Sequence, residues 1–113
     1  MRIIRRLVGE RPITQFGSVS ASVRGVTREG HAVVIEIGPG GNLGRHPATV
    51  AQLFVIVSGS GWVSGADGER VAVSAGEAAL WEAGEEHESG TDEGMTALVV
   101  ESERLDVFSG FPD

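Results

Sequence analysis

Three side chains in this sequence have the chemistry to hold a ligand or a metal ion: His46, Gln52 and His87. His46 follows a glycine-rich bend, and His87 comes shortly after a second glycine turn. Gln52 precedes the apolar run Leu53 to Val57. A side-chain amide beside such a run is costly to bury unless it is hydrogen-bonded or contacts a ligand. These residues predict a binding site, provided that the fold brings the two imidazoles together.

The segment 49–57 is the strand that we expect to carry this site. Side chains alternate along a strand, so Gln52 shares one face with Phe54 and Ile56. The other face is also apolar, and a strand that is apolar on both faces is normally covered on both. We therefore expect one face to line an interior and the other to pack on a second sheet or a second subunit. The second option predicts a homodimer.

The remaining positioning elements are short strands. Glycine and aspartate turns interrupt the sequence at close intervals, and no window sustains a helical period over three turns. This pattern indicates an all-β sandwich or barrel, and a length of 113 residues fits a single domain over 1–113. The Asp67-Gly68 pair predicts a hairpin turn. The candidate strands are 2–8, 18–26, 31–37, 49–57, 60–64, 69–73, 77–82, 86–90, 94–101 and 104–108.

The composition excludes several classes of function. A net charge of −7 argues against nucleic-acid partners and against binding to anionic membranes. The chain contains no cysteine, which excludes thiolate catalysis and thiolate metal sites. Its longest apolar run is much shorter than a membrane span, so we expect a cytoplasmic protein.

Two stretches of the sequence resemble the two motifs of the cupin superfamily. The first motif reads G-x5-H-x-H-x3-4-E-x6-G, and with matching spacing it falls on Gly40, His46, Ala48, Gln52 and Gly59. The second motif reads G-x5-P-x-G-x2-H-x3-N, and it falls on Gly76, Glu82, Gly84, His87 and Thr91. The resemblance covers about residues 30–101.

The resemblance implies a double-stranded β-helix, or jelly-roll barrel, that is often dimeric. In metal-binding cupins, two His and one Glu of the first motif and one His of the second hold a divalent metal. Carried over, His46 and His87 are the first and last ligands, whereas Ala48 offers no donor and Gln52 offers a neutral oxygen. The site then holds either one divalent ion (Zn, Ni, Mn, Fe or Cu) or no metal at all.

These observations lead to two main functional hypotheses, and a third possibility is a structural role through dimer formation alone, which predicts a filled interior with no pocket. The first is a barrel that binds a small molecule, with or without a weakly coordinated metal at His46, Gln52 and His87. The second is a metal-dependent oxygenase, isomerase or lyase that acts on a small polar substrate. In both, the ligand pocket is expected to be lined by Phe54, Ile56, Leu80, Trp81 and Glu36.

Three features of the sequence each allow two interpretations. Glu36 is either an interior carboxylate that supplies the charge Gln52 lacks or an outward residue of an edge strand. His31 is either a third imidazole of the site or an exposed residue at a strand start. Phe108 and Phe111 in the tail cover either the core or a second subunit.

Overall fold

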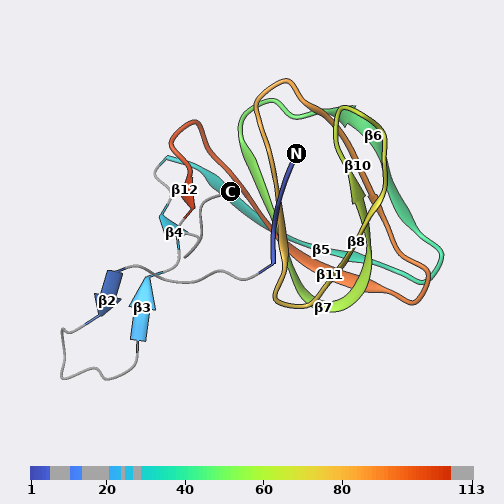
Figure 1. The fold of residues 1–113 in the computed structure, drawn as a ribbon, viewed down its shortest axis with the longest axis horizontal. Helices are drawn as coiled ribbons and strands as arrows, with labels where there is room; N and C mark the ends of the chain where they lie inside the picture. Colours follow the sequence, from blue (N-terminus) through green and yellow to red (C-terminus); the bar gives the residue numbers. More distant parts are fainter. Residues whose placement is uncertain (6–10, 14–20, 24, 27–28, 108–113) are drawn as a thin grey trace.

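The computed structural model describes residues 1–5, 11–13, 21–23, 25–26 and 29–107 (Figure 1). All regular secondary structure in these residues is β-strand. The strands are β1 (Arg2–Ile4), β2 (Arg11–Ile13), β3 (Ala21–Val23), β4 (Gly25–Val26), β5 (His31–Ile37), β6 (Asn42–Pro47), β7 (Gln52–Ser64), β8 (Val71–Ser74), β9 (Ala78–Trp81), β10 (Glu86–Gly90), β11 (Met95–Glu101) and β12 (Asp106–Val107).

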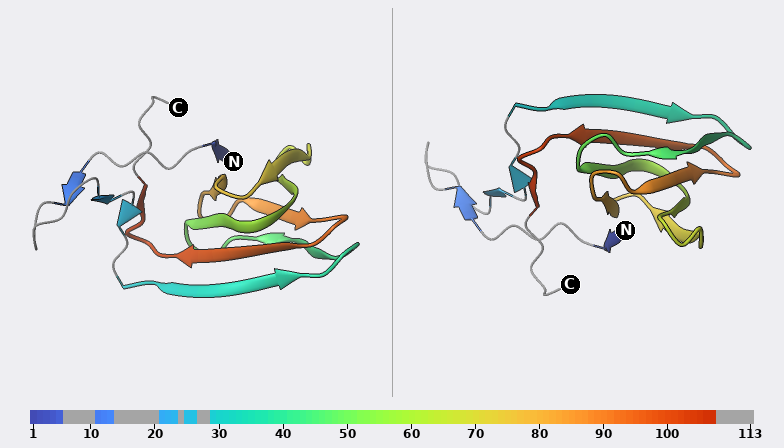
Figure 2. Two further views of the ribbon diagram at one scale, coloured as in Figure 1. Left: turned by 90° about the horizontal axis from the view of Figure 1, so that it is seen from below. Right: turned by 90° about the horizontal axis from the view of Figure 1, so that it is seen from above.

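Two antiparallel sheets share the long strand β7, and together they form a double-stranded β-helix. The first half of β7 pairs with β9 and β11, and β11 pairs in turn with the edge strand β5. The second half of β7 pairs with β8 and β10, and β10 pairs with β6. Figure 2 shows β5 and β11 side by side along one flank. The predicted all-β jelly-roll fold is confirmed.

Glycines allow β7 to bend from one sheet into the other. Gly59 has a φ of 80°, which glycine adopts without steric penalty. At Gly61, a Cβ atom would overlap the carbonyl oxygen of Gly90 on β10. The sequence predicts separate strands at 49–57 and 60–64, but these glycines keep the strand continuous while it turns.

The two faces of β7 pack in different clusters, as the alternation predicts. Phe54 and Ile56 are almost fully buried in the main core between the sheets. Leu53 packs on the opposite face against Ile4 and Ala78. The inner face thus forms the floor of the barrel, and Gln52 lies at its end.

One strand near the site was not predicted. The sequence places His46 at the end of a glycine-rich loop, but residues 42–47 form β6 and pair with β10. Pairing with β10 supplies the backbone hydrogen bonds that this glycine-containing segment would otherwise lack.

The expectations for the chain ends are only partly covered by the structure. Strand β1 accounts for the start of the predicted segment 2–8, and β12 for part of 104–108. Phe108 and Phe111 lie outside the described residues. The part of the chain that is described contains no helix long and apolar enough to cross a lipid bilayer.

Candidate functional site

The pairing of β6 with β10 places the two histidines opposite each other. His46 and His87 are direct cross-strand partners. Their ring centroids are 4.4 Å apart, and the ring planes are tilted by 56°. His46 is exposed, whereas His87 is only 4% exposed. The two imidazoles that the sequence predicts to meet therefore do so, one at the surface and one inside.

Backbone carbonyls hold both rings in the same way. His46 Nδ1 lies 2.6 Å from the Gly44 carbonyl oxygen, and His87 Nδ1 lies 3.2 Å from the Glu85 carbonyl oxygen. A carbonyl oxygen can only accept, so each Nδ1 carries the hydrogen. In a neutral ring the lone pair is then on Nε2, which leaves one acceptor nitrogen per histidine for a ligand.

The histidines border a cavity of about 180 Å³ in the barrel. Its polar side chains are His46, Gln52, His87, Ser89 and Glu101, and its apolar ones are Val33, Ile35, Leu43, Phe54, Trp81 and Val99. The polar side chains other than Ser89 come from the ends of β6, β7, β10 and β11. The cavity thus combines an apolar interior with a limited set of polar groups, as small-molecule sites usually do.

Trp81 forms the wall behind the buried histidine. Its ring centroid lies 4.4 Å from that of His87 with a tilt of 31°, and 5.6 Å from that of Phe54. The indole N–H donates to the Ser64 carbonyl at 3.1 Å. Because its only donor is used there, Trp81 contributes surface and rigidity to the cavity rather than a hydrogen bond.

Glu101 is a site residue that the sequence analysis missed. The register of β11 on β7 makes Glu101 the cross-strand partner of Gln52, and Gln52 Nε2 donates to Glu101 Oε1 at 2.6 Å. This contact accounts for the amide at the end of an apolar strand. The available signal was the parity of Glu101 with Val99 and Ala97, which both face the core.

Burial controls the protonation of His87. Loss of solvation lowers its pKa below the ordinary 6.5, and the neighbouring His46 acts in the same direction. The hydrogen bond to the Glu85 carbonyl and the carboxylates of Glu85 and Glu101 act in the opposite direction but do not outweigh burial. His87 therefore favours the neutral form, in which its Nε2 can accept.

The structure does not bring three of the predicted pocket residues to this cavity. Ile56 is fully buried beneath it in the core. Leu80 faces the opposite side of β9 from Trp81 and packs in the outer cluster. Glu36 is exposed on β5, with the opposite parity to the lining residue Ile35. The carboxylate in the cavity is that of Glu101, so the interior placement of Glu36 is wrong.

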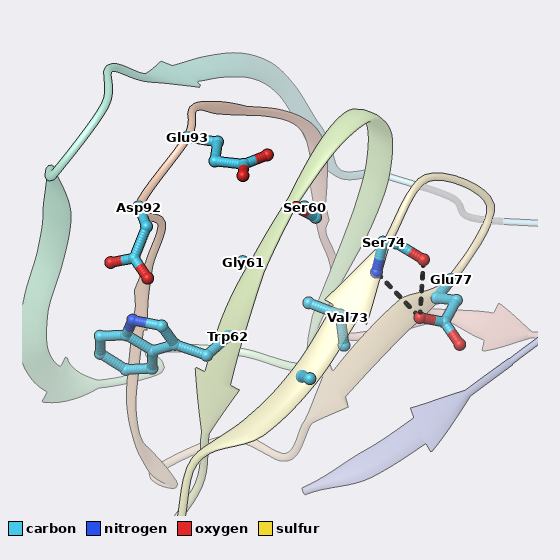
Figure 3. Close-up of a pocket in the computed structure, with 9 residues that line it drawn as sticks. Ser60, Gly61, Trp62, Val73, Ser74, Glu77, Asp92 and Glu93 are labelled. Atoms are coloured by element: carbon cyan, nitrogen blue, oxygen red, sulfur yellow. Dashed lines mark hydrogen bonds between the residues drawn. The ribbon is translucent and has the colours of Figure 1, made fainter.

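A larger hollow, of about 450 Å³, lies elsewhere on the barrel and contains no imidazole (Figure 3). Its aromatic residue, Trp62, is already covered, because the Arg70 guanidinium lies 3.7 Å from the ring centroid. Its Glu77 carboxylate accepts hydrogen bonds from Ser74 and Arg5. These groups are used in holding strands together, so the smaller cavity is the better candidate site.

Comparison with known proteins identifies the family. A family model described as the Cupin domain matches residues 33–103, which is more than half of the chain. This chain is a cupin. The predicted resemblance is thereby confirmed, and both histidines of the site fall inside the matched region. None of the curated protein sequences matches the chain.

Solved cupin structures resemble this one in fold. A double-stranded β-helix protein from Klebsiella pneumoniae is 20% identical, with a TM-score of 0.61 over 81% of this chain and 88% of the other. A predicted oxalate decarboxylase from Thermotoga maritima is 20% identical, with a TM-score of 0.57 over 68% of this chain and 65% of the other. The DMSP lyase DddQ from Ruegeria pomeroyi is 19% identical, with a TM-score of 0.61 over 65% of this chain. This cupin spans 65% of the Thermotoga protein and 38% of the lyase.

The donor set of this cupin does not fit a resident metal centre. The buried methyl group of Ala48 stands where the motif has its second histidine, and Gln52 stands where it has glutamate. Gln52 is engaged with Glu101. Within the described ranges, no three His, Cys, Asp or Glu side chains come together closely enough to hold an ion. Two imidazoles and one amide oxygen fall short of the usual three firm ligands of a catalytic zinc site.

The lowered pKa of His87 predicts how stability depends on pH. Between the folded-state pKa and the ordinary 6.5, the unfolded chain binds more protons than the folded chain. The free energy of unfolding should therefore fall as the pH drops below about 6.5. Urea denaturation at several pH values between about 7.5 and 5.5 measures this slope.

Substitution of His87 tests whether this residue causes the pH dependence of the free energy of unfolding. His87→Gln should flatten the pH dependence in this window, whereas His31→Gln, at an exposed position, should leave it unchanged. An unaltered slope in His87→Gln would contradict the assignment.

Proposed function

We propose that this cupin binds a small molecule in the cavity beside His46 and His87. The observation that carries the proposal is the cross-strand histidine pair at an apolar cavity, with both Nδ1 atoms held by carbonyls and both Nε2 atoms left as acceptors. An apolar cavity of about 150 Å³ accommodates one benzene molecule. The volume of about 180 Å³ here therefore suits a ligand of roughly that size.

A binding role is better supported than catalysis. The residues do not fit the metal centre of metal-binding cupins, so we derive no reaction step through a metal. The lyase and the predicted decarboxylase are under 25% identical to this chain and support the fold alone. No observation in the cavity favours a particular reaction over binding.

The cavity can be tested by filling it. Val33 lines the cavity from the edge strand β5 and is 49% exposed, so Val33→Trp should occupy the space with little disturbance of the core. Benzyl alcohol, a neutral probe of suitable size, should shift the indole N–H resonance of Trp81 in the unmodified protein. Val33→Trp should weaken this binding at least about tenfold, since the ligand loses its apolar contacts.

The matched control for this test is Ala32→Trp, which adds the same side chain at the adjacent, outward-facing position of β5. It should bind benzyl alcohol as the unmodified protein does. Equal weakening in both variants, or no response of Trp81 to the probe, would contradict the proposed binding site.

We further propose that any divalent metal held by His46, Gln52 and His87 is bound weakly. The support is the loss of one imidazole and one carboxylate from the motif. Metal analysis of untagged protein after dialysis against a mild chelator should find well under one ion per chain. About one retained ion per chain, lost in a His46→Ala, His87→Ala double variant, would instead favour the metal-dependent enzyme.

The outer face of the sheet supports a homodimer, which we also propose. Val34 and Val57 are 69% and 52% exposed, and Leu98 is the cross-strand partner of both Val34 and Val55. Light scattering at micromolar concentration should give the mass of two chains. Val34→Glu should lower the measured mass toward that of one chain, because it places a charge on the apolar face. A single-chain mass for the unmodified protein would contradict the dimer.

A further inference from the structure

We infer that the ligand of this cavity is a small organic cation, a primary ammonium group attached to a compact apolar body. The inference rests on the proposed function, since it specifies the chemical class of the molecule that the cavity binds. It comes from the hydrogen-bonding character, the charge and the shape of the cavity.

The polar side chains of the cavity offer mainly acceptors. His46 and His87 each present Nε2, because Nδ1 is held by a backbone carbonyl. Gln52 donates one of its two amide hydrogens to Glu101, and its carbonyl oxygen is an acceptor. Trp81 donates its N–H to a backbone carbonyl. Among the described lining residues, the Ser89 hydroxyl and the second amide hydrogen of Gln52 are able to donate, and the acceptors outnumber these donors. A ligand that complements this set must itself supply donors, and an ammonium group supplies three.

The charge of the cavity has the same implication. Glu101 is half-buried, and its carboxylate accepts a hydrogen bond from the neutral amide of Gln52. His31 and Arg104 line an adjacent hollow that shares Glu101, but neither forms an ion pair with it in the structure. Among the residues that the structure describes, no cationic side chain pairs with Glu101, and a bound ammonium would stabilise this partly buried carboxylate.

Two of the described arginines form their contacts away from Glu101. Arg45 adjoins His46 in sequence but donates to the carbonyls of Gly65 and Ala66 at 3.0 and 3.1 Å. Arg5 pairs with Glu77 at 3.0 Å. These contacts hold the β7–β8 hairpin and the end of β1, so neither guanidinium is positioned to neutralise Glu101.

The apolar part of the cavity defines the rest of the ligand. Behind the polar groups lie Val33, Ile35, Leu43, Phe54 and Val99, which offer only hydrocarbon contacts. A volume of about 180 Å³ suits a single ring or a short branched chain. An anion in this cavity would instead face the Glu101 carboxylate, which would repel it.

Three probes of one size test the inference: benzylamine, benzyl alcohol and benzoate. Their dissociation constants are measured by calorimetry at neutral pH in the presence of a chelator, so that no metal bridges the ligand. Benzylamine should bind about tenfold or more tightly than benzyl alcohol, as expected for a hydrogen bond to a charged partner, and benzoate should bind weakest. Equal affinity for the amine and the alcohol would overturn the inference.

The variant Glu101→Gln tests whether the Glu101 carboxylate causes the preference for benzylamine over benzyl alcohol. It removes the charge but retains an amide that can accept from Gln52. It should lower the affinity for benzylamine much more than the affinity for benzyl alcohol, so that the preference for benzylamine is lost. The matched control is Glu36→Gln, which removes one carboxylate from the outer face of the same sheet and should retain the preference.

The outcomes separate this inference from the proposed function. If neither benzylamine nor benzyl alcohol binds, the proposed binding function fails, and the inference fails with it. If benzyl alcohol binds, and binds more weakly in Val33→Trp, but benzylamine binds no more tightly than benzyl alcohol, the binding site stands. In that case the inference of a cationic ligand is wrong. A preference for benzylamine that survives in Glu101→Gln would also overturn the role of that carboxylate.

Discussion

The antiparallel register between β6 and β10 is the constraint on which the site depends. It places His46 opposite His87, although the two lie far apart in the sequence. Gly44 on β6 and Glu85, directly before β10, supply the backbone carbonyls that hold the two Nδ1 atoms. A shift of one residue would move one imidazole to the other face of its sheet, because side chains alternate along a strand. The identity of the site is therefore a consequence of strand pairing.

Within this framework, the carboxylate has a different origin from the one that the cupin motif specifies. The motif places glutamate on the strand that begins at Gln52, whereas here the charge comes from Glu101 on the neighbouring strand. The Gln52 amide connects the two positions by donating one of its two hydrogens to Glu101. The described lining of the cavity is therefore rich in acceptors and carries one carboxylate, rather than a converging set of metal ligands. We regard this rearrangement as the feature that separates this chain from metal-binding cupins.

Much of the fold was predictable from the sequence, because the alternation along residues 52–57 and the spacing of two motifs are local signals. His46, Gln52, His87, Phe54 and Trp81 were predicted for the site and all line one cavity. Glu101 could not be identified in the same way, since its place opposite Gln52 depends on the register of β11.

The predictions that failed share a physical cause. Leu80 and, in one of its two interpretations, Glu36 were assigned to the interior from apolar neighbours alone, yet in such runs both parities appear equally apolar. The strand β6 resembles a loop in sequence because it contains glycine and proline, and only its partner β10 makes it a strand. Long-range pairing is information that a single sequence does not display directly.

The proposed site depends most on the contact between the two imidazoles. In protein labelled at histidine, a nuclear Overhauser measurement between the ring protons of His46 and His87 tests it directly. With ring centroids 4.4 Å apart, a clear cross-peak is predicted, and it should vanish in His46→Ala. A well-resolved spectrum in which both rings are assigned and no such cross-peak appears would contradict the account.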